Sequence, residues 1–517
     1  MRGTEDKMIK IVLLPMDERP CNRRYAEELF SHDDIRIVCP GKLGNKKEPA
    51  DIHEIVSFLE QECADADGLV LSMDMLLYGG LVPSRIHHLS SCDLAQRMEV
   101  VKKIRVRYPS LKIYAWHCIM RCPDYSSDEE EPDYYEQYGA MIHKIGEAVH
   151  KSRVDMCDPG EVDRLLRKMD QGALDDYVSR RAMNKAMNLR ALDFVDAGVI
   201  DALVIPQDDS APFGYAAMDQ KEIRAAVVER NLMDKVLIYP GADEVSLTLT
   251  ARMVNHLRGK KPSVYIRYAS EQAKMVIPIY EGNSLENTVK SHVISAGCRI
   301  CDTMRDADFV LMVTAPAYRI REANEQPSLD PGYLTERNLP ALLDETEECL
   351  RRGKPVVICD NAYGNGGELA LIRMLNKLKI LDKIAGYAGW NTSANTLGTA
   401  LAEGVDFDAH GRSQAHMNFL MERYVEDCGY MSNVRWKIAS LLGTEDLQDG
   451  IDLSPFSYTE VGEERGVVSQ LIQKELEHYI HTDMSSVSER VQIDDVWMPW
   501  RRMFEAGIRV WYQINEK

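Results

Sequence analysis

Long hydrophobic runs are missing from this chain. No stretch reaches the roughly 18 consecutive apolar residues that a membrane-spanning helix needs. The opening residues MRGTEDKMIK lead directly into IVLLP, without the apolar core and small-residue cleavage site of a signal peptide. We therefore expect a cytoplasmic protein that does not contact a membrane.

Positive charge is also scarce. The chain has 62 Lys and Arg against 82 Asp and Glu, a formal net charge of −20, and no block rich in Lys or Arg. A nucleic-acid-binding protein needs such a basic patch to meet the phosphates. The composition predicts a protein without a nucleic-acid partner, and it leaves open whether the chain forms homo-oligomers.

Cysteine and histidine are too dilute to define a disulfide scaffold or a transition-metal site. Twelve cysteines in 517 residues, many inside apolar runs, indicate reduced thiols. Cys298 and Cys301 have a C-x-x-C spacing, but no second pair follows. His117 is the one histidine that follows a predicted strand. We predict no cofactor, with Mg²⁺ or Ca²⁺ on carboxylates such as Asp17, Asp74, Asp209 and Asp243 as the alternative.

Two common catalytic motifs are absent as well. The sequence has no G-x-S-x-G elbow for a nucleophilic serine. The glycine-rich segment DNAYGNGG (360–367) lacks the spacing and the lysine of a phosphate-binding loop. Covalent acyl transfer and nucleotide binding are therefore poor interpretations of this chain.

Short apolar runs of strand length, each followed by polar residues and a helical stretch, are what the sequence does contain. They include IVLLP, LVLSM, IYAWH, LVIPQ, VLIYP, VVICD and YAGWN, with SVYIRY (263–268) and DFVLMV (308–313) between them. This alternation predicts an α/β fold. We expect a decorated TIM (β/α)8-like barrel over residues 1–400, with a small α/β insert at about 263–305 if DFVLMV supplies the sixth strand. The alternative is two doubly wound α/β domains.

Residues 401–517 have a different pattern. Longer amphipathic segments, such as GVVSQLIQKELEHYI, replace the short apolar runs. We expect a helical C-terminal extension. The acidic stretch SSDEEEPDYYEQYG (126–139) does not read as core, and we expect it to form a long loop over the mouth of the barrel.

Acidic residues follow most of the predicted strands. In a TIM barrel such residues converge on one site at the carboxyl ends of the strands. Asp208 and Asp209 form an adjacent pair, in which repulsion favours one protonated and one ionised carboxyl group, as acid/base catalysis requires. We predict them as the catalytic residues. Both can reach one pocket only if the strand has ended by Gln207, because neighbouring side chains on a strand point to opposite faces.

The predicted substrate-binding residues lie at the same strand ends. Carboxylates, amides and an aromatic ring suit a neutral ligand rich in hydroxyl groups. Arginines at these ends either pair with the carboxylates or bind an anionic substrate group. The predicted set is Asp17, Arg19, Asp74, Arg121, Asp243, Glu244, Asp360, Asn361, Trp390, Asn391 and Asn395.

Two family resemblances extend this interpretation. The segments LPMDERPCN, DMLLYGGLVPSR, MRCP, QDDSAPFG, PGADEV, DNAYGNGG, GYAGWNTSANTLG and VWMPWRRMFE resemble a bacterial family known as domain-of-unknown-function family 4127. An Asp-Asp pair, then a DN motif, then an Asn-bearing last strand end resemble retaining hexosaminidases of the O-GlcNAcase type. That likeness implies a TIM barrel, with Asp208 orienting the acetamido group, Asp209 as general acid/base, and Asp360 and Asn391 binding sugar hydroxyls.

The predicted function is therefore a glycoside hydrolase. Its expected substrates are small oligosaccharides or glycosides, including N-acetylhexosaminides. One alternative is a metal-assisted hydrolase or lyase of a small anionic metabolite, using Asp17, Asp74 and Asp243. The second alternative is a non-catalytic sugar-binding protein, in which Asp208-Asp209-Ser210 would only form a turn.

Overall fold

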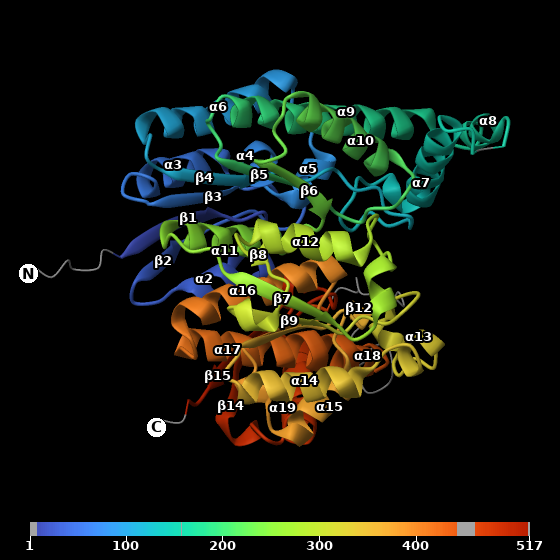
Figure 1. The fold of residues 1–517 in the computed structure, drawn as a ribbon. Coiled ribbons are helices and arrows are strands. Elements are labelled where there is room, and N and C mark those ends of the chain that lie inside the picture. Colours follow the sequence, from blue (N-terminus) through green and yellow to red (C-terminus); the bar gives the residue numbers. More distant parts are fainter. Residues whose placement is uncertain (1–7, 157, 442–460, 515–517) are drawn as a thin grey trace, which may run out of the picture. The chain divides into compact units, whose positions relative to one another are not determined.

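The computed structural model describes residues 8–156, 158–441 and 461–514, which divide into two compact units (Figure 1). The first unit comprises Met1–Glu18, Asp33–Met253 and Tyr280–Asn283, and the second comprises Arg19–His32, Val254–Ile279 and Ser284–Lys517. Each unit contains a parallel sheet with connecting helices. The predicted α/β class is confirmed.

The sheet of the first unit has six parallel strands in the order β2-β1-β3-β4-β5-β6. The strands are β1 (Ile9–Leu14), β2 (Ile35–Val38), β3 (Gly68–Ser72), β4 (Lys112–Trp116), β5 (Ala202–Gln207) and β6 (Val236–Pro240). β3 and β5 are buried along their whole length. Continuous apolar runs such as LVLS and ALVI suit strands covered on both faces, which explains why they form here.

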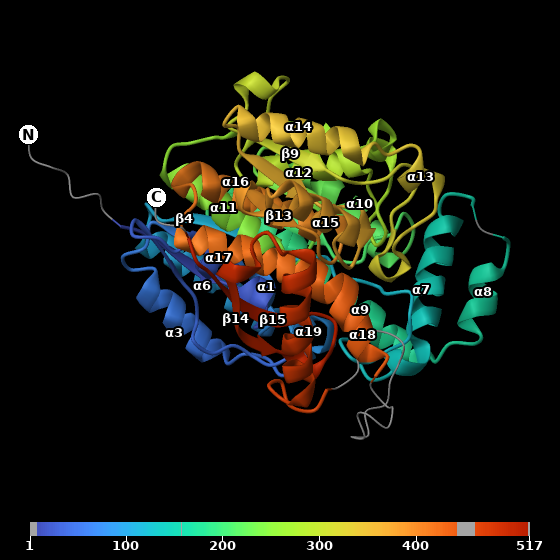
Figure 2. The same ribbon diagram turned by 90° about the horizontal axis from the view of Figure 1, so that it is seen from below.

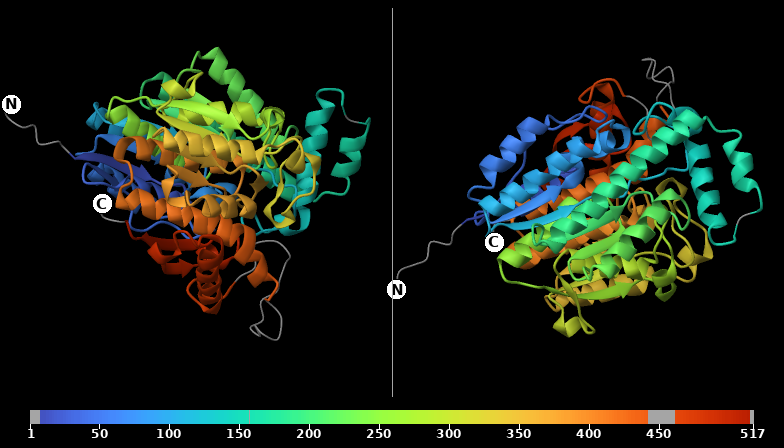
Figure 3. Two further views of the ribbon diagram at one scale, coloured as in Figure 1. Left: turned by 60° about the horizontal axis from the view of Figure 1, so that its bottom comes forward. Right: turned by 90° about the horizontal axis from the view of Figure 1, so that it is seen from above.

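Helices surround this sheet. They are α3 (Ile52–Glu62), α4 (Met73–Tyr78), α5 (Leu81–Ile86), α6 (Ser91–Arg107), α7 (Tyr135–Ser152), α8 (Glu161–Leu166), α9 (Gln171–Asp196) and α10 (Tyr215–Glu229); α11 (Val245–Leu257) crosses the boundary between the units. The long helices α6 and α9 lie side by side along the sheet, and α7 pairs with α8 (Figures 1 and 3). Val12, Leu71, Ile113, Leu203 and Ile238 form part of the core between strands and helices.

The sheet of the second unit has five parallel strands in the order β13-β11-β9-β7-β8. They are β7 (Ser263–Tyr268), β8 (Arg299–Ile300), β9 (Phe309–Val313), β11 (Val356–Cys359) and β13 (Gly386–Ala388). Two short strands, β10 (Arg321–Glu322) and β12 (Tyr363–Gly364), pair separately. The strand-length runs named in the sequence therefore form strands in both units.

The rest of the second unit is mainly helical, with a terminal hairpin. Its helices are α1 (Pro20–Arg23), α2 (Tyr25–Phe30), α12 (Leu285–Ser295), α13 (Pro331–Leu334), α14 (Leu339–Arg351), α15 (Leu369–Leu378), α16 (Ser393–His410), α17 (Gln414–Arg423), a π-helix (Tyr424–Val434), α18 (Arg435–Ala439) and α19 (Val467–Asp483). The antiparallel strands β14 (Val491–Trp497) and β15 (Gly507–Tyr512) pack against α19 and α17 (Figure 2).

The predicted barrel is wrong. In the described residues the parallel strands form two open sheets, so the alternative of two doubly wound α/β units describes the fold. The error has a physical cause. A strand followed by a helix and a parallel strand looks the same locally in a barrel and in an open sheet. Only the order of the strands distinguishes the two folds.

The predicted insert and extension also need correction. SVYIRY and DFVLMV form neighbouring strands β7 and β9 of one sheet, so the segment between them is not a separate subdomain; it belongs to the second unit except for Tyr280–Asn283, which belong to the first. The segment from Met275 to Tyr280 is not a strand. Residue 400 lies inside α16, and the C-terminal region carries the β14–β15 hairpin in addition to its predicted helices.

The two sheets share one strand order. When the strands of each sheet are numbered along the chain, the second sheet reads 2-1-3-4-5, which is also the order of the first five strands of the first sheet. In this arrangement the order reverses between strands 1 and 3, and ligands of open α/β sheets bind beyond the carboxyl ends of the strands at that point. For the first unit this switch point lies between β1 and β3.

A buried arginine organises the π-helix of the second unit. Arg423 is fully buried, and its guanidinium donates to Glu422 at 3.0 Å, Glu426 at 2.6 Å and Asp427 at 2.8 Å. It also lies 4.0 Å from the ring centroid of Tyr25 on α2. One cation therefore holds three carboxyl groups inside the protein.

Among the described residues, no helix combines the length and the apolar character needed to span a bilayer.

Candidate functional site

The carboxyl edge of the first sheet gathers seven of the predicted residues, six acidic residues and Arg121 from the loop after β4. Because its strands are parallel, their carboxyl ends lie at one edge. Asp17 follows β1, Asp74 follows β3, Asp208 and Asp209 follow β5, and Asp243 and Glu244 follow β6. The sheet order places the end of β4, with His117, between β3 and β5.

Asp208 and Asp209 converge on two buried arginines. Arg85 Nη2 donates to Asp208 Oδ2 at 2.8 Å, and Arg121 Nη1 donates to Asp209 Oδ2 at 3.1 Å. The same Arg121 nitrogen lies 3.9 Å from Asp208 Oδ2. The side chains of Asp208 and Asp209 are 19% and 25% exposed, whereas those of Arg85 and Arg121 are buried. The two carboxylates are therefore partly exposed to solvent, and the two guanidinium groups that bind them are buried.

The backbone explains how both carboxylates reach one place. β5 ends at Gln207, which meets the condition set by the sequence, and Asp209 has a φ of +41° in the left-handed region. A non-glycine residue in this region is strained by roughly 1–3 kcal/mol and is held there by its surroundings. The turn redirects Asp209, so that it shares the Arg121 guanidinium with Asp208.

The pKa of Asp209 differs strongly from that of a free carboxyl group. Burial raises it to about 7, and the neighbouring Asp208 charge adds to the increase, while Arg121 and Arg85 oppose it. Near neutral pH Asp209 is therefore held between its protonated and ionised forms. A group in that state can donate or accept a proton.

The acidic stretch supplies two further members of this cluster. Glu130 Oε2 accepts from Arg85 at 2.8 Å and from Arg121 at 3.1 Å, and Glu131 Oε1 accepts from Arg121 Nε at 2.7 Å. Both glutamates are buried. The view that this stretch is not core is therefore wrong at these two positions, because the two arginines compensate the buried charge. Of the stretch predicted to form a loop (126–139), residues 126–134 contain no helix or strand, whereas residues 135–139 form the start of α7.

Asp74 is a second carboxyl group with a raised pKa. It lies in the first turn of α4, 2% exposed, and its Oδ2 accepts from the Cys118 backbone N–H at 3.0 Å. Burial raises its pKa to about 7, although the Cys118 hydrogen bond and the Arg85 charge act in the opposite direction. Asp74 and Asp209 therefore titrate in the same pH range at one edge of the sheet.

Asp74→Asn is expected to stabilise the protein at alkaline pH. The folded-state pKa of Asp74 lies above its usual value, so the ionised carboxyl group destabilises the native state increasingly as pH rises towards and past 7. Since one pKa unit is about 1.4 kcal/mol, the variant should gain roughly 2–4 kcal/mol in free energy of unfolding at pH 8 and little near pH 4. Urea denaturation at both pH values measures this difference; a variant equally or less stable at pH 8 contradicts it.

The other acidic residues at this edge have local partners. Asp17, Asp243 and Glu244 are at most 5% exposed. Glu244 Oε2 accepts from the backbone N–H of Ala242 at 3.0 Å, which holds the turn after β6. These three residues flank the cluster of Asp208 and Asp209 along the sheet edge, and their burial favours a supporting role.

The remaining predicted residues belong to the second unit, where most of them act as core. Asp360 is fully buried and accepts from Thr314 Oγ1 at 2.9 Å, Tyr387 Oη at 2.8 Å and Glu368 N at 2.7 Å. Burial raises its pKa to about 6. Asp360 thus ties together the ends of β9, β11 and β13, and its hydrogen bonds are used within the protein.

Of the amide and aromatic residues of the second unit, Asn361, Trp390 and Asn395 are buried and Asn391 is partly buried. Asn361 donates to Ser393 O at 3.1 Å, and Trp390 Nε1 donates to Thr399 Oγ1 at 3.1 Å. Trp390 is 3% exposed and packs edge-on to Tyr25, so it is not an open platform for a sugar ring. Asn395 is 3% exposed in the first turn of α16. Asn391 has a φ of +55°, and its carbonyl accepts from Asn365 N at 2.8 Å.

Arg19 also lies in the second unit. Its guanidinium is 3.9 Å from Glu505 and stacks on Trp500 at 4.6 Å from the ring centroid. Both partners come from the segment VWMPWRRMFE near the C-terminus. The contacts are those of a packed ion pair and not of an arginine open to an anionic substrate.

Sequence reasoning missed part of the cluster. The sequence interpretation places Glu130 and Glu131 only in a loop and gives Arg85 no role. The signal that the sequence offers is the acidic run DEEE (128–131), which needs cationic partners wherever it is buried. Opposite charges that cannot both remain solvated tend to pair.

Histidines of the second unit form a separate cluster. Asp406 is fully buried and faces His32 Nε2 at 2.7 Å, His410 Nδ1 at 2.8 Å and His416 Nδ1 at 2.8 Å. His32, Asp406 and His410 form a group of potential metal ligands within the described residues. Arg258, however, lies 2.6 Å from His410 Nε2. Because arginine can only donate, Nδ1 of His410 carries the proton and is not free to ligate a metal ion. The arrangement is a closed hydrogen-bonded network.

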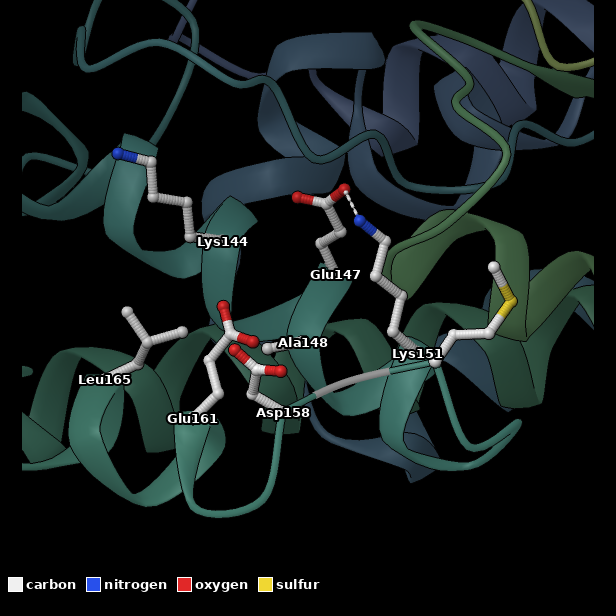
Figure 4. A pocket seen from close by; sticks show the side chains of 8 residues that line it. Lys144, Glu147, Ala148, Lys151, Asp158, Glu161 and Leu165 are labelled. Carbon is white, nitrogen blue, oxygen red and sulfur yellow. Dashed lines mark ion pairs between the residues drawn. The ribbon is translucent and has the colours of Figure 1, made fainter.

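A surface pocket lies between α7 and α8 of the first unit (Figure 4). Its lining includes Lys144, Glu147, Lys151, Asp158 and Glu161, and Lys151 pairs with Glu147 at 2.7 Å. None of the predicted site residues lines this pocket. Its charges are mixed and exposed, so it does not compete with the Asp208–Asp209 cluster as the candidate site.

Fold and site together define a class: an α/β protein of two parallel-sheet units with a buried carboxylate–arginine cluster at the carboxyl edge of the first sheet. The chain belongs to the DUF4127 family, described as a protein of unknown function, whose family model matches residues 11–509. This confirms the first of the two resemblances seen in the sequence.

The second resemblance gains no support. The chain matches none of the curated proteins. The hexosaminidase likeness also implied a TIM barrel, whereas the structure has two open sheets. Asp360 and Asn391, to which that likeness assigned sugar hydroxyls, lie in the second unit, and Asp360 has its oxygens bonded internally.

Proposed function

We propose that this protein is a glycoside hydrolase that uses Asp208 and Asp209 in acid/base catalysis. Its substrates are small oligosaccharides or glycosides, with N-acetylhexosaminides as one candidate class. Asp209 protonates the leaving oxygen of the glycosidic bond, and the neighbouring Asp208, which is hydrogen-bonded to Arg85, stabilises the positive charge that develops on the sugar ring.

One observation carries this proposal: two adjacent carboxyl groups have different electrostatic environments. Asp208 accepts a charge-assisted hydrogen bond from Arg85 at 2.8 Å, whereas the pKa of Asp209 is raised to about 7. Pairs of carboxyl groups whose environments separate their ionisation states divide the acid and base roles in this way. Strain at Asp209 is a second sign of function.

The charge of the cluster favours a neutral substrate. Arg85 and Arg121 face four carboxyl groups, those of Asp208, Asp209, Glu130 and Glu131. Their guanidinium groups are occupied by the protein's own carboxylates, so an anionic substrate would meet net negative charge. A sugar is compatible with this surface. Direct binding of a small anionic metabolite by Arg85 or Arg121 is disfavoured, because both guanidinium groups already pair with carboxyl groups of the protein.

A panel of chromogenic glycosides, assayed with and without a chelator, tests the proposal. Hydrolysis that is insensitive to the chelator and lost in Asp209→Asn supports it. Hydrolysis that the chelator abolishes supports instead a Mg²⁺ or Ca²⁺ enzyme using Asp17, Asp74 and Asp243. Ligand-induced increases in Tm without turnover support a sugar-binding protein.

The pH dependence gives a sharper prediction. Since the acid form of Asp209 is required, activity should fall as pH rises through about 7. Arg121→Met removes a cation that lowers the pKa of Asp209, so the alkaline limb of the kcat/KM profile should move to higher pH by roughly one unit or more. Arg230→Met, at a more exposed ion pair with Asp193, is the control and should leave the limb in place. A lower rate with an unmoved limb would assign Arg121 a structural role only.

A further inference from the structure

Three buried polar side chains meet at the ends of β3 and β4. Asp74 and Tyr78 lie four positions apart on α4 and so share one face of the helix. His117 follows β4 directly, and its ring lies 6.1 Å from that of Tyr78. Asp74 and Tyr78 are 2% exposed and His117 is fully buried. This group adjoins the switch point of the first sheet.

His117 and Tyr78 have unused hydrogen-bonding capacity. Neither ring nitrogen of His117, nor the hydroxyl of Tyr78, has a hydrogen-bond partner among the described residues. Burial lowers the pKa of His117 to about 3, so the ring is neutral and offers one donor and one acceptor. Buried polar groups nearly always have a partner, whether protein, water or ligand. Two such side chains beside one carboxyl group, that of Asp74, indicate a site for a small polar molecule.

The spacing of Asp74 and His117 defines the size of that molecule. His117 Nε2 lies 4.0 Å from Asp74 Oδ1, which is too long for a hydrogen bond. One oxygen atom at ordinary hydrogen-bond distance from both would bridge this separation. The other carboxylate oxygen, Oδ2, is already held by the Cys118 N–H, so Oδ1 is fixed in orientation. Full burial favours a water molecule over a larger polar group.

We propose that Asp74 and His117 bind one water molecule at the ends of β3 and β4, and that this water is the nucleophile consumed in hydrolysis. The nucleophilic role rests on the proposed function. The segment that carries His117 also joins the two parts of the site: β4 lies beside β5, and Ile119 N donates to Pro206 O at 3.0 Å, two residues before Asp208.

The reaction balances as follows. The water oxygen bonds to the anomeric carbon while one of its protons passes to the Asp74 carboxylate. The glycosidic carbon–oxygen bond breaks, and the leaving oxygen takes the proton of Asp209. Solvent then returns a proton from Asp74 to Asp209. A direct attack by water, without a covalent intermediate, inverts the anomeric configuration.

A high-resolution crystal structure tests the binding site independently of any activity. An ordered water within hydrogen-bond distance of Asp74 Oδ1 and His117 Nε2 is expected. It should be lost or displaced in Asp74→Ala and weakened in Tyr78→Phe if the tyrosine hydroxyl is a third partner. Well-defined side chains without a water between Asp74 and His117 would overturn the proposal even if the enzyme proved to be a glycosidase.

Kinetics test the nucleophilic role. With a glycoside that the wild-type protein hydrolyses, Asp74→Asn should lower kcat by at least about 100-fold with little change in KM, and it should remove the acid limb of the pH profile. NMR of the first product should show the inverted anomer. Asp124→Asn, at an exposed aspartate, is the matched control. Retention of configuration, or an unchanged kcat in Asp74→Asn, overturns the nucleophilic role of the water. If the wild-type protein hydrolyses no glycoside, the proposed function and the nucleophilic role are both wrong. The water site itself is tested by the crystal structure alone.

Discussion

Asp209→Asn is expected to reduce kcat/KM for alkyl glycosides by about 10²–10⁴-fold, the usual contribution of a general acid. The amide keeps the shape of the carboxyl group and its contact with Arg121, but it has no proton to transfer. The largest losses should occur with the most basic leaving groups.

Leaving-group dependence makes this result specific. A glycoside with an acidic phenol as leaving group departs without protonation, so Asp209→Asn should hydrolyse it at nearly the wild-type rate. Asp124→Asn should match the wild-type protein on every substrate. A uniform loss across all leaving groups would indicate that Asp209 positions the substrate or holds the loop, and would contradict its role as acid.

Arg423→Met is expected to lower the free energy of unfolding by about 3–5 kcal/mol, because it leaves buried carboxylates without their cation. Three carboxyl groups, those of Glu422, Glu426 and Asp427, lose their shared partner. The methionine side chain fills much of the same apolar volume, so the loss reports charge more than packing. Urea denaturation of the full chain, followed by tryptophan fluorescence, measures the change through the transition of the second unit.

The loss should grow with pH. Burial already raises the pKa of Asp427 to about 7 and that of Glu422 to about 8 with Arg423 in place. Without the arginine both pKa values rise further. The native state then retains protons that the unfolded chain releases, so stability falls as pH increases from 6 to 9.

Lys437→Met is the matched control for this substitution. Lys437 is 51% exposed and pairs with Glu475, and an exposed pair contributes roughly 0–1 kcal/mol. If Arg423→Met lowers the free energy of unfolding no more than the control does, or if its effect does not depend on pH, the three carboxyl groups are neutral in the native state.

The sequence predicted the strands well, but not their assembly. Runs such as GLVLS and FVLMV are apolar throughout, which is what a strand buried on both faces requires. Whether such strands close into a barrel depends on which strand pairs with which. That information lies in contacts between distant segments, such as β7 with β9, and no local pattern contains it.

The site shows the same division between local and distant information. The adjacency of Asp208 and Asp209, and the end of their strand at Gln207, could be read from neighbouring residues. The burial of Glu131 beside Arg121, and of Asp360 behind Thr314 and Tyr387, could not. An aspartate after a strand has the same local pattern whether it faces solvent or bonds internally, so Asp360 and Asp208 looked equivalent in the sequence.

Because both sheets have the same strand order, the two units have comparable architectures, but the side chains at their strand ends differ. At the carboxyl edge of the first sheet, Tyr78 and His117 have polar atoms without a hydrogen-bond partner among the described residues. At the same edge of the second sheet, both oxygens of Asp360 accept hydrogen bonds from neighbouring residues. The two sheets thus share a strand order but differ in how the polar groups at their strand ends are hydrogen-bonded. Transferring the residues around Asp208 to the second unit would therefore require replacing buried, hydrogen-bonded side chains such as Asp360, and not only exposed ones.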